Sequence, residues 1–188
     1  MKVALGLLHY PIYDSQRKVV ATNITNLDIH DIARASRVYG VEKYYIIHPM
    51  EEQLMFVSRI LEHWRIGDGA KFNPMRRTAL TMVHTANSLE SAVKDWAGDE
   101  TTDIVATHAR SLDGVPAITF RELRDKAAAN SEGRLFLLFG TGFGLTEDVM
   151  RSCTALLEPI RGGSKDDYRH LSVRSAVSIC LDRLFGPW

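Results

Sequence analysis

The chain contains 188 residues, of which 45% are hydrophobic and 24% are charged. These are ordinary values for a globular protein, so the length predicts one domain over residues 1–188. Basic and acidic residues balance at 23 each, which argues against a protein that binds polyanions over its whole surface but leaves local basic patches open. Two cysteines in apolar contexts favour reduced thiols in a cytoplasmic protein over a disulfide framework.

The first part of the chain alternates between predicted strands and helices. Residues 3–9 are mostly apolar, and we expect a first strand because the run is too short to cross a membrane and no cleavage site follows it. Thr25 and Asp28 have the spacing of a capping box, which predicts a helix start, and Gly40 suits its end. Arg34 is predicted on or near the inward face of this helix. Further strands are expected at 43–48 and 77–83, and helices at 51–65 and 88–96, with a break at 67–70.

The second part of the chain continues the alternation. A second capping box, Thr119 with Glu122, predicts a helix as far as about Ala129. Strands are expected at 102–107, 135–139 and 155–160, a short helix after Thr146, and a last helix at 171–185. Alternating strands and helices are typical of α/β proteins, so we predict a mostly parallel sheet with helices on both faces.

A glycine-rich turn follows the most apolar predicted strand. Gly140, Gly142 and Gly144 permit positive φ angles and a close approach of the backbone to a ligand. Three interpretations are open: a tight turn with no ligand, a dinucleotide site in which Glu158 holds a ribose, and a site for another nucleotide-like ligand. Leu145 stands where the third glycine of a dinucleotide motif belongs, and no Lys-Ser/Thr pair follows to make a phosphate-binding loop.

The third interpretation rests on irregular segments after three of the strands, namely 107–110, 140–145 and 158–170. If these strands are neighbours, the segments converge at one edge of the sheet and offer mainly backbone polar groups with Thr, Ser and Gly side chains. Such a site suits an adenosine-type ligand, and the scarcity of lysine suits a positively charged sulfonium.

A polar loop carries several charged side chains just before the last helix. The loop contains Arg161, Lys165, Arg169 and His170, and Arg174 follows in the helix. These cations either form a solvated surface or bind a polyanionic substrate. Asp166 and Asp167 either offset these cations or accept a proton from a substrate.

Arg34 either pairs with Asp31 or binds a phosphate. The histidines lack metal-ligand spacing, so no metal is predicted.

The last predicted helix is apolar on more than one face, which indicates a helix that is buried all round or partly covered by another subunit.

Three segments together resemble the motifs of the SPOUT superfamily of S-adenosylmethionine-dependent RNA methyltransferases. Residues 28–41 are similar to its first motif, with Arg34 at the arginine position, and residues 137–145 are similar to the second. Glu158–Ile160 followed by residues 170–179 resembles the third. The likeness covers nearly the whole chain and is greatest to a small bacterial group sometimes fused behind a tRNA guanine-N1 methyltransferase.

The resemblance implies a C-terminal trefoil knot, a homodimer with the first and last helices at the interface, and methyl transfer from S-adenosylmethionine to tRNA or rRNA. It implies cofactor contacts in the strand-end segments and in the last helix. These are Thr107, His108, Leu138, Phe139, Gly140, Thr141, Gly142, Gly144, Ile160, Leu171, Ser172 and Ser175. The candidate catalytic residues are Arg34, Asp167 and Arg174.

The sequence departs from the SpoU branch of that superfamily at several motif positions. Asp28 and His30 replace Asn and Gly, Ser172 replaces Asn, and the second motif is one residue shorter. If the acceptor is a nitrogen of a nucleobase, Asp167 is the predicted general base. If the acceptor is a ribose hydroxyl, Arg34 is predicted to steer the phosphate and the hydroxyl. The alternatives are a dinucleotide-dependent oxidoreductase and an RNA-binding or assembly module without turnover.

Overall fold

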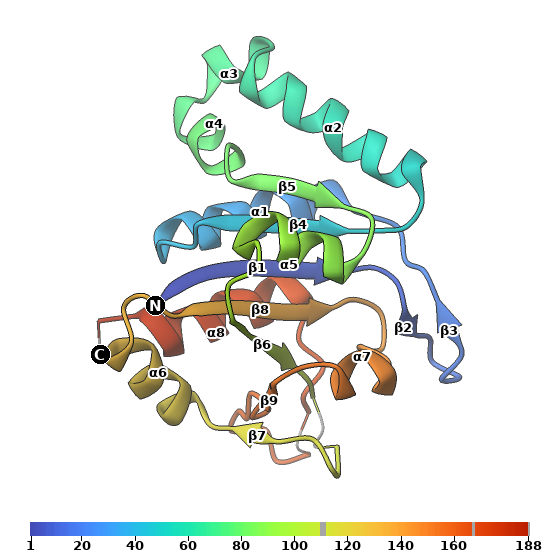
Figure 1. The fold of residues 1–188 in the computed structure, drawn as a ribbon. Coiled ribbons are helices and arrows are strands. Elements are labelled where there is room, and N and C mark those ends of the chain that lie inside the picture. Colours follow the sequence, from blue (N-terminus) through green and yellow to red (C-terminus); the bar gives the residue numbers. More distant parts are fainter. Residues whose placement is uncertain (110–111, 167, 188) are drawn as a thin grey trace.

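A computed structural model describes residues 1–109, 112–166 and 168–187. Its main feature is a seven-stranded sheet in which every pair of neighbouring strands is parallel, as predicted (Figure 1). The strand order is β5 (Val83–Ala86), β4 (Lys43–Ile47), β1 (Lys2–Leu8), β8 (Arg134–Gly140), β6 (Thr102–Thr107), β9 (Ala155–Leu157) and β7 (Ala117–Ile118).

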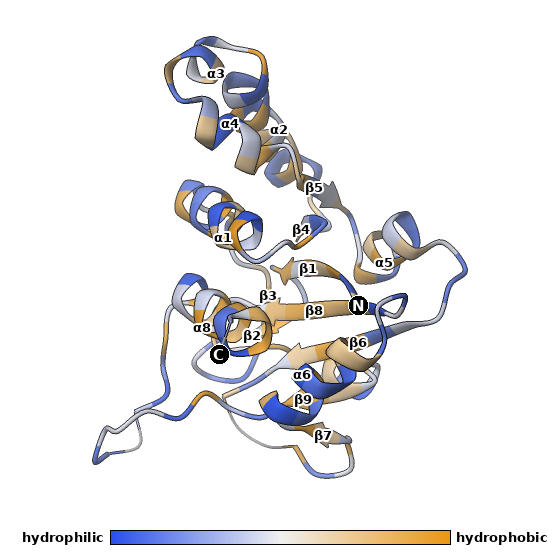
Figure 2. Ribbon diagram, turned by 90° about the vertical axis from the view of Figure 1, so that its left-hand side faces the viewer, coloured by the Kyte–Doolittle hydropathy of each residue, from blue (hydrophilic) through white to orange (hydrophobic). Residues whose placement is uncertain are grey.

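Helices cover both faces of this sheet, and each face has its own apolar core. Figure 2 shows α1 (Asn26–Val38) and α8 (Val173–Phe185) on one side of the sheet and α5 (Leu89–Ala97) on the other. The alternation along β8 explains the two cores, since Leu135 and Leu137 enter the first and Phe136 and Leu138 the second. The remaining helices are α2 (Glu51–Arg65), α3 (Asp68–Phe72), α4 (Pro74–Leu80), α6 (Phe120–Ala129) and α7 (Glu147–Arg151).

Most predicted boundaries agree with the structure to within two residues. Both capping boxes start helices: Thr25 accepts a hydrogen bond from the Asp28 N–H, and Thr119 exchanges bonds with Glu122. Gly40 follows α1 with φ +71°, the left-handed conformation expected of a residue that ends a helix. Cys153 and Cys180 are both buried and free.

The strand predicted over 77–83 is wrong, because residues 74–80 form α4 and the strand begins only at Val83. The Asn73 side chain accepts a hydrogen bond from the Arg76 N–H at 3.0 Å, and Pro74 occupies the first helical position, where its missing N–H costs nothing. The break predicted after the helix over 51–65 is confirmed, since α2 ends at Arg65, and a short helix that was not predicted, α3, starts at Asp68.

A small antiparallel hairpin, β2 (Ile12–Tyr13) with β3 (Val19–Val20), leaves the main sheet after β1. Figure 1 shows it beyond the carboxyl ends of β1 and β8. The sequence did not predict the pairing of Val19–Val20 with Ile12–Tyr13.

Candidate functional site

A cavity of about 820 Å³ lies at the carboxyl ends of the central strands. Its walls come from the ends of β8, β6 and β9, from the hairpin, and from the first turn of α8. The expected convergence of the strand-end segments is confirmed for the described residues, because β8, β6 and β9 are adjacent in the sheet. This volume lies within the usual range for small-molecule sites, and the edge is where open parallel sheets bind their ligands.

The glycine turn after β8 forms one wall of the cavity. Gly142 and Gly144 have φ values of +56° and +103°, which side chains rarely tolerate. A Cβ atom on Gly142 would also lie 2.9 Å from Ile12 Cδ1 and 3.0 Å from the Tyr13 carbonyl oxygen. Gly142 is therefore required both by its backbone conformation and by the hairpin packed against it.

The hairpin holds the glycine turn through backbone hydrogen bonds that the sequence did not reveal. The Tyr13 N–H donates to the Gly144 carbonyl at 2.9 Å, and the Phe143 N–H donates to the Tyr13 carbonyl at 3.0 Å. Arg17 adds an ion pair with Glu147 at 3.0 Å, and both residues line the cavity. No sequence signal identified the glycine turn as the partner of this hairpin.

A buried carboxylate and a guanidinium meet beside the start of α8. Asp28 is only 5% exposed, and its Oδ1 accepts a hydrogen bond from Arg174 Nη1 at 2.9 Å. Its Oδ2 accepts a bond from the Thr25 hydroxyl at 2.6 Å. Arg174 Nε lies 3.5 Å from Asp31 Oδ2, so Asp31 pairs with Arg174 and not with Arg34 as one interpretation supposed. Sequence reasoning treated Asp28 as a helix cap and missed this second role.

A chain of hydrogen bonds runs from the cavity to a buried histidine. The Thr141 and Thr22 hydroxyls lie 2.6 Å apart, and Thr22 Oγ1 lies 3.0 Å from His9 Nδ1. Burial lowers the pKa of His9 to about 4, although the nearby Asp28 charge acts in the opposite direction. His9 is therefore neutral at neutral pH and fixes the two threonines through an uncharged hydrogen bond.

Most predicted cofactor contacts line this cavity. They are Thr107, His108, Phe139, Gly140, Thr141, Gly142, Gly144, Ile160, Leu171 and Ser172. Leu138 does not, because it is fully buried in the core behind the strand end. Ser175 is exposed and binds Ser172, with 3.0 Å between the hydroxyl oxygens.

The three candidate catalytic residues have different positions. Arg174 lines the cavity, whereas Asp167 lies outside the described residues. Arg34 is exposed and does not line the cavity, so its predicted inward position is wrong. The buried face of α1 is Ile29, Ile32, Ala33 and Ser36, and the helical rotation of about 100° per residue turns Arg34 away from it.

The charges at the cavity suit a ligand with a positive sulfur and an adenosine group. In the described part of the chain, three arginines line the cavity: Arg17 and Arg174 each have a carboxylate partner, and Arg169 donates to the Ala109 carbonyl at 3.4 Å. The lining there also contains four acids, which are Asp14, Asp28, Glu147 and Glu158. No lysine contributes to the lining among the described residues. In the same part of the chain, no group of three or more His, Cys, Asp or Glu side chains is arranged to hold a metal ion.

Comparisons with known proteins identify the family of the chain. The sequence profile of a family described as "SAM-dependent RNA methyltransferase" matches residues 2–186. The chain therefore belongs to the S-adenosylmethionine-dependent RNA methyltransferases. A "tRNA (guanine-N(1)-)-methyltransferase" from Oleidesulfovibrio alaskensis is 41% identical over 185 residues, which cover 96% of this chain and 41% of that protein. The chain thus spans less than half the length of that relative.

Solved structures show the same fold. A putative methylase family protein from Neisseria gonorrhoeae has a TM-score of 0.68 at 20% identity, covering 99% of this chain and 82% of that one. A TrmH/SpoU tRNA modifying enzyme from A. aeolicus has a TM-score of 0.52 at 16% identity, covering 97% and 72%. The resemblance drawn from the motifs is confirmed by the family match and by the sequence relative, and these neighbours show the fold that it implied. Membership of the methyltransferase family sets aside the oxidoreductase interpretation.

Glu158 caps the start of α6, which differs from the ribose-binding role that the dinucleotide interpretation gave it. Its Oε1 accepts a hydrogen bond from the Phe120 N–H at 2.7 Å, at the first turn of α6.

No helix in the described residues is long and apolar enough to cross a membrane.

Proposed function

We propose that the cavity at the carboxyl ends of β8, β6 and β9 holds S-adenosylmethionine and presents its methyl group to a nucleotide of tRNA or rRNA. The observation that carries the proposal is the meeting of three sequence-distant segments at one cavity, with Gly142 and Gly144 in left-handed conformations. The methyl donor supplies a carbon already activated by its sulfonium, so the protein chiefly aligns donor and acceptor.

The residues of the chain would divide this work between them. Thr107, Gly140, Ile160 and Leu171 would enclose the adenosine group, since all four line the cavity. The hairpin would exclude water from the mouth. Asp28 and Arg174 would fix the start of α8, because their bond joins the first helix to the last.

The acceptor must lose a proton. For a base nitrogen we propose that the Asp167 carboxylate accepts it, and for a ribose hydroxyl we propose that Arg34 orients the hydroxyl while its proton passes to solvent water. An exposed Arg34 fits the second role if the protein is a homodimer whose interface includes α1 and α8. Contacts within one chain place these helices side by side, so one surface includes both: Arg174 pairs with Asp28 and Asp31, and Tyr39 donates a 2.8 Å hydrogen bond to Asp182. Leu27 and Val38 on α1 are also exposed in one copy.

The same family membership supports three further proposals. We propose that residues 1–188 act as one methyltransferase domain in the cytoplasm, and that the segment between β9 and α8 completes a trefoil knot. The adjacency of β8, β6 and β9 in the sheet supports the knot proposal, because the chain must return past these strands to reach α8.

The test is calorimetric titration of the protein with S-adenosylmethionine, followed by transfer of a radiolabelled methyl group to total tRNA and to rRNA. Saturable binding and label in one RNA fraction are expected. Ile160→Arg should abolish both by entering the cavity, while Ala128→Arg should leave both intact because Ala128 is exposed on α6 and does not line the cavity. Absence of heat and of label at saturating cofactor would refute the proposal.

A further inference from the structure

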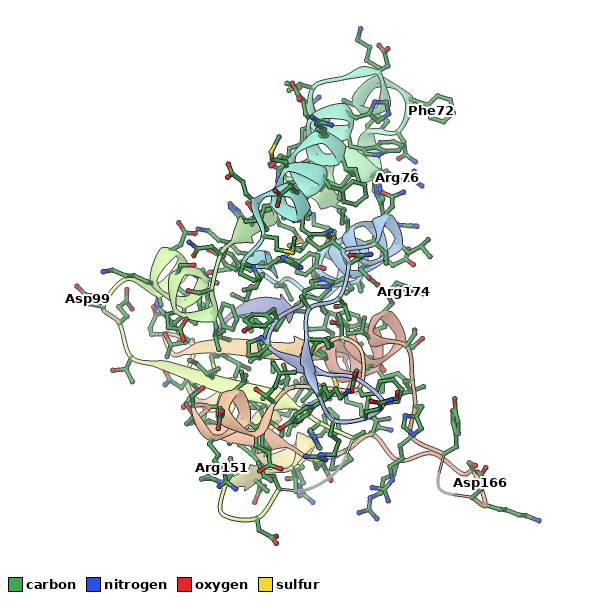
Figure 3. All side chains as sticks on the ribbon, turned by 90° about the vertical axis from the view of Figure 1, so that its right-hand side faces the viewer. Phe72, Arg76, Asp99, Arg151, Asp166 and Arg174 are labelled. Atoms are coloured by element: carbon green, nitrogen blue, oxygen red, sulfur yellow. The ribbon has the colours of Figure 1, made fainter. Side chains whose placement is uncertain are left out.

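A helical arm built from α2, α3 and α4 extends from the edge of the sheet beside β5 (Figure 1). At its tip, three large apolar side chains are exposed to an unusual degree: Ile66 by 75%, Phe72 by 88% and Met75 by 82%. Clustered exposed apolar side chains mark interaction surfaces in proteins. Figure 3 shows Phe72 at the outer end of the arm, pointing away from the body.

The same tip is strongly basic in a chain whose formal net charge is zero. Residues 65–77 contain four cations, Arg65, Lys71, Arg76 and Arg77, and a single acid, Asp68. No carboxylate among the described residues lies within ion-pairing distance of Lys71, Arg76 or Arg77. This excess of uncompensated positive charge is what a polyanionic partner would neutralise.

Arg76 is held in place without an anionic partner. Its guanidinium carbon lies 4.5 Å from the centre of the Trp64 ring, an arrangement that fixes the group while leaving its charge available. Its Nε is buried and has no hydrogen-bond partner, and the Nδ1 of the adjacent His30 is in the same condition. Burial and the Arg76 charge both lower the pKa of His30.

The tip connects to the proposed active site along one side of the molecule. α4 packs against α1, and α1 packs against α8, which carries Arg174 in its first turn. In Figure 3, Phe72, Arg76 and Arg174 lie along the same edge of the view. The exposed Arg34 and Arg37 of α1 belong to the helix between them.

We propose that residues 65–77 form an RNA-docking surface that stacks an unpaired base on Phe72 and holds the adjoining phosphates with Lys71, Arg76 and Arg77. An exposed aromatic ring among unpaired cations is the combination that binds single-stranded nucleic acid, and unpaired bases are the part of RNA that proteins read most readily. This inference rests on the proposed RNA methyltransferase function and adds the surface that captures the substrate.

The first experiment measures binding of a fluorescent hairpin RNA with an unpaired loop, and of the matching paired duplex, by fluorescence anisotropy. Phe72→Ala should weaken hairpin binding by about 5- to 100-fold, the range for losing one stacked base, with a smaller effect on the duplex. Lys71→Ala with Arg77→Ala should reduce the slope of log Kd against log salt by about 0.7 for each phosphate that the protein no longer neutralises.

The matched control is Lys94→Ala with Arg121→Ala, which removes two exposed cations from α5 and α6, away from the arm. It should leave RNA binding unchanged. All variants should bind S-adenosylmethionine as the wild type does, which separates failure of this inference from failure of the proposed function. Equal RNA affinity of wild type and tip variants, or absence of wild-type RNA binding, would overturn the docking surface.

Light scattering tests whether the tip binds a second copy of the chain and not RNA, because it measures the mass of the protein in solution. The tip variants should have the same solution mass as the wild type. If Phe72→Ala converts a dimer into a monomer, the tip is a subunit interface and the proposal is wrong.

Discussion

Arg174 Nη1 lies 2.9 Å from Asp28 Oδ1, joining the first helix of the chain to the last across 146 residues of sequence. The Asp28 carboxylate is almost fully buried, whereas about a third of the Arg174 side chain is exposed. Both residues line the cavity, so a largely buried ion pair forms part of the wall of the proposed cofactor site.

We predict that Arg174→Ala lowers the free energy of unfolding more than Asp28→Asn does. Among the described residues, removing the arginine leaves a buried charge with only Thr25 as a side-chain hydrogen-bond donor, whereas Asp28→Asn replaces that charge with a neutral amide. Breaking buried pairs costs about 3–5 kcal/mol, and the partial exposure of Arg174 reduces this to about 1–3 kcal/mol.

Urea denaturation of both single variants and the double variant measures the coupling between them. The double variant should lose at least about 0.5 kcal/mol less unfolding free energy than the two single variants lose in sum. A parallel cycle on the exposed Lys2–Glu132 pair, at 3.6 Å, should give a coupling close to zero. Additive effects at Asp28 and Arg174 would show that their bond contributes nothing.

Gly142→Ala should weaken S-adenosylmethionine binding and destabilise the protein by about 1–2 kcal/mol. The left-handed conformation penalises any Cβ, and here the added atom would also press on Ile12 and Tyr13. Gly163→Ala is the control, because its Cβ would meet open space. Calorimetry and urea denaturation check both variants, and wild-type affinity in Gly142→Ala would contradict a role for this turn in binding.

His9 should make the protein less stable as the pH falls from about 6.5 towards 4. The folded state keeps His9 neutral with its pKa near 4, so the unfolded chain binds the extra proton first and is favoured across this window. The expected loss is about 3 kcal/mol for this one group. Measured from pH 7 to pH 4, His9→Gln should lose correspondingly less stability than the wild type, and parallel pH profiles would refute the assignment.

Cys153 and Cys180 should be unreactive until the protein unfolds. Burial raises the pKa of Cys153 to about 11 and that of Cys180 to about 12, so almost no thiolate is present at pH 8. Ellman's reagent should therefore react slowly with the native protein and rapidly with both thiols in urea. Fast reaction of either thiol under native conditions would show that its surroundings open readily.

The sequence alone was sufficient for the sheet's parallel character and for most element boundaries. Buried parallel strands are continuous apolar runs, as in β8, and capping residues such as Thr25 and Thr119 mark helix starts through purely local hydrogen bonds. The α4 segment was mistaken for a strand because its β-branched and apolar residues outweighed the local Asn73-Pro74 start signal.

Three features were decided only by tertiary structure, because each depends on residues that are distant along the chain. The hairpin reaches the glycine turn through backbone hydrogen bonds, which carry no side-chain signature. The partner of Asp28 is Arg174, and a charge pattern cannot choose among many possible partners. The outward position of Arg34 depended on which face of α1 met the sheet. Local hydrogen bonding thus fixed the elements, whereas the packing of helices on the sheet determined which side chains meet at the cavity.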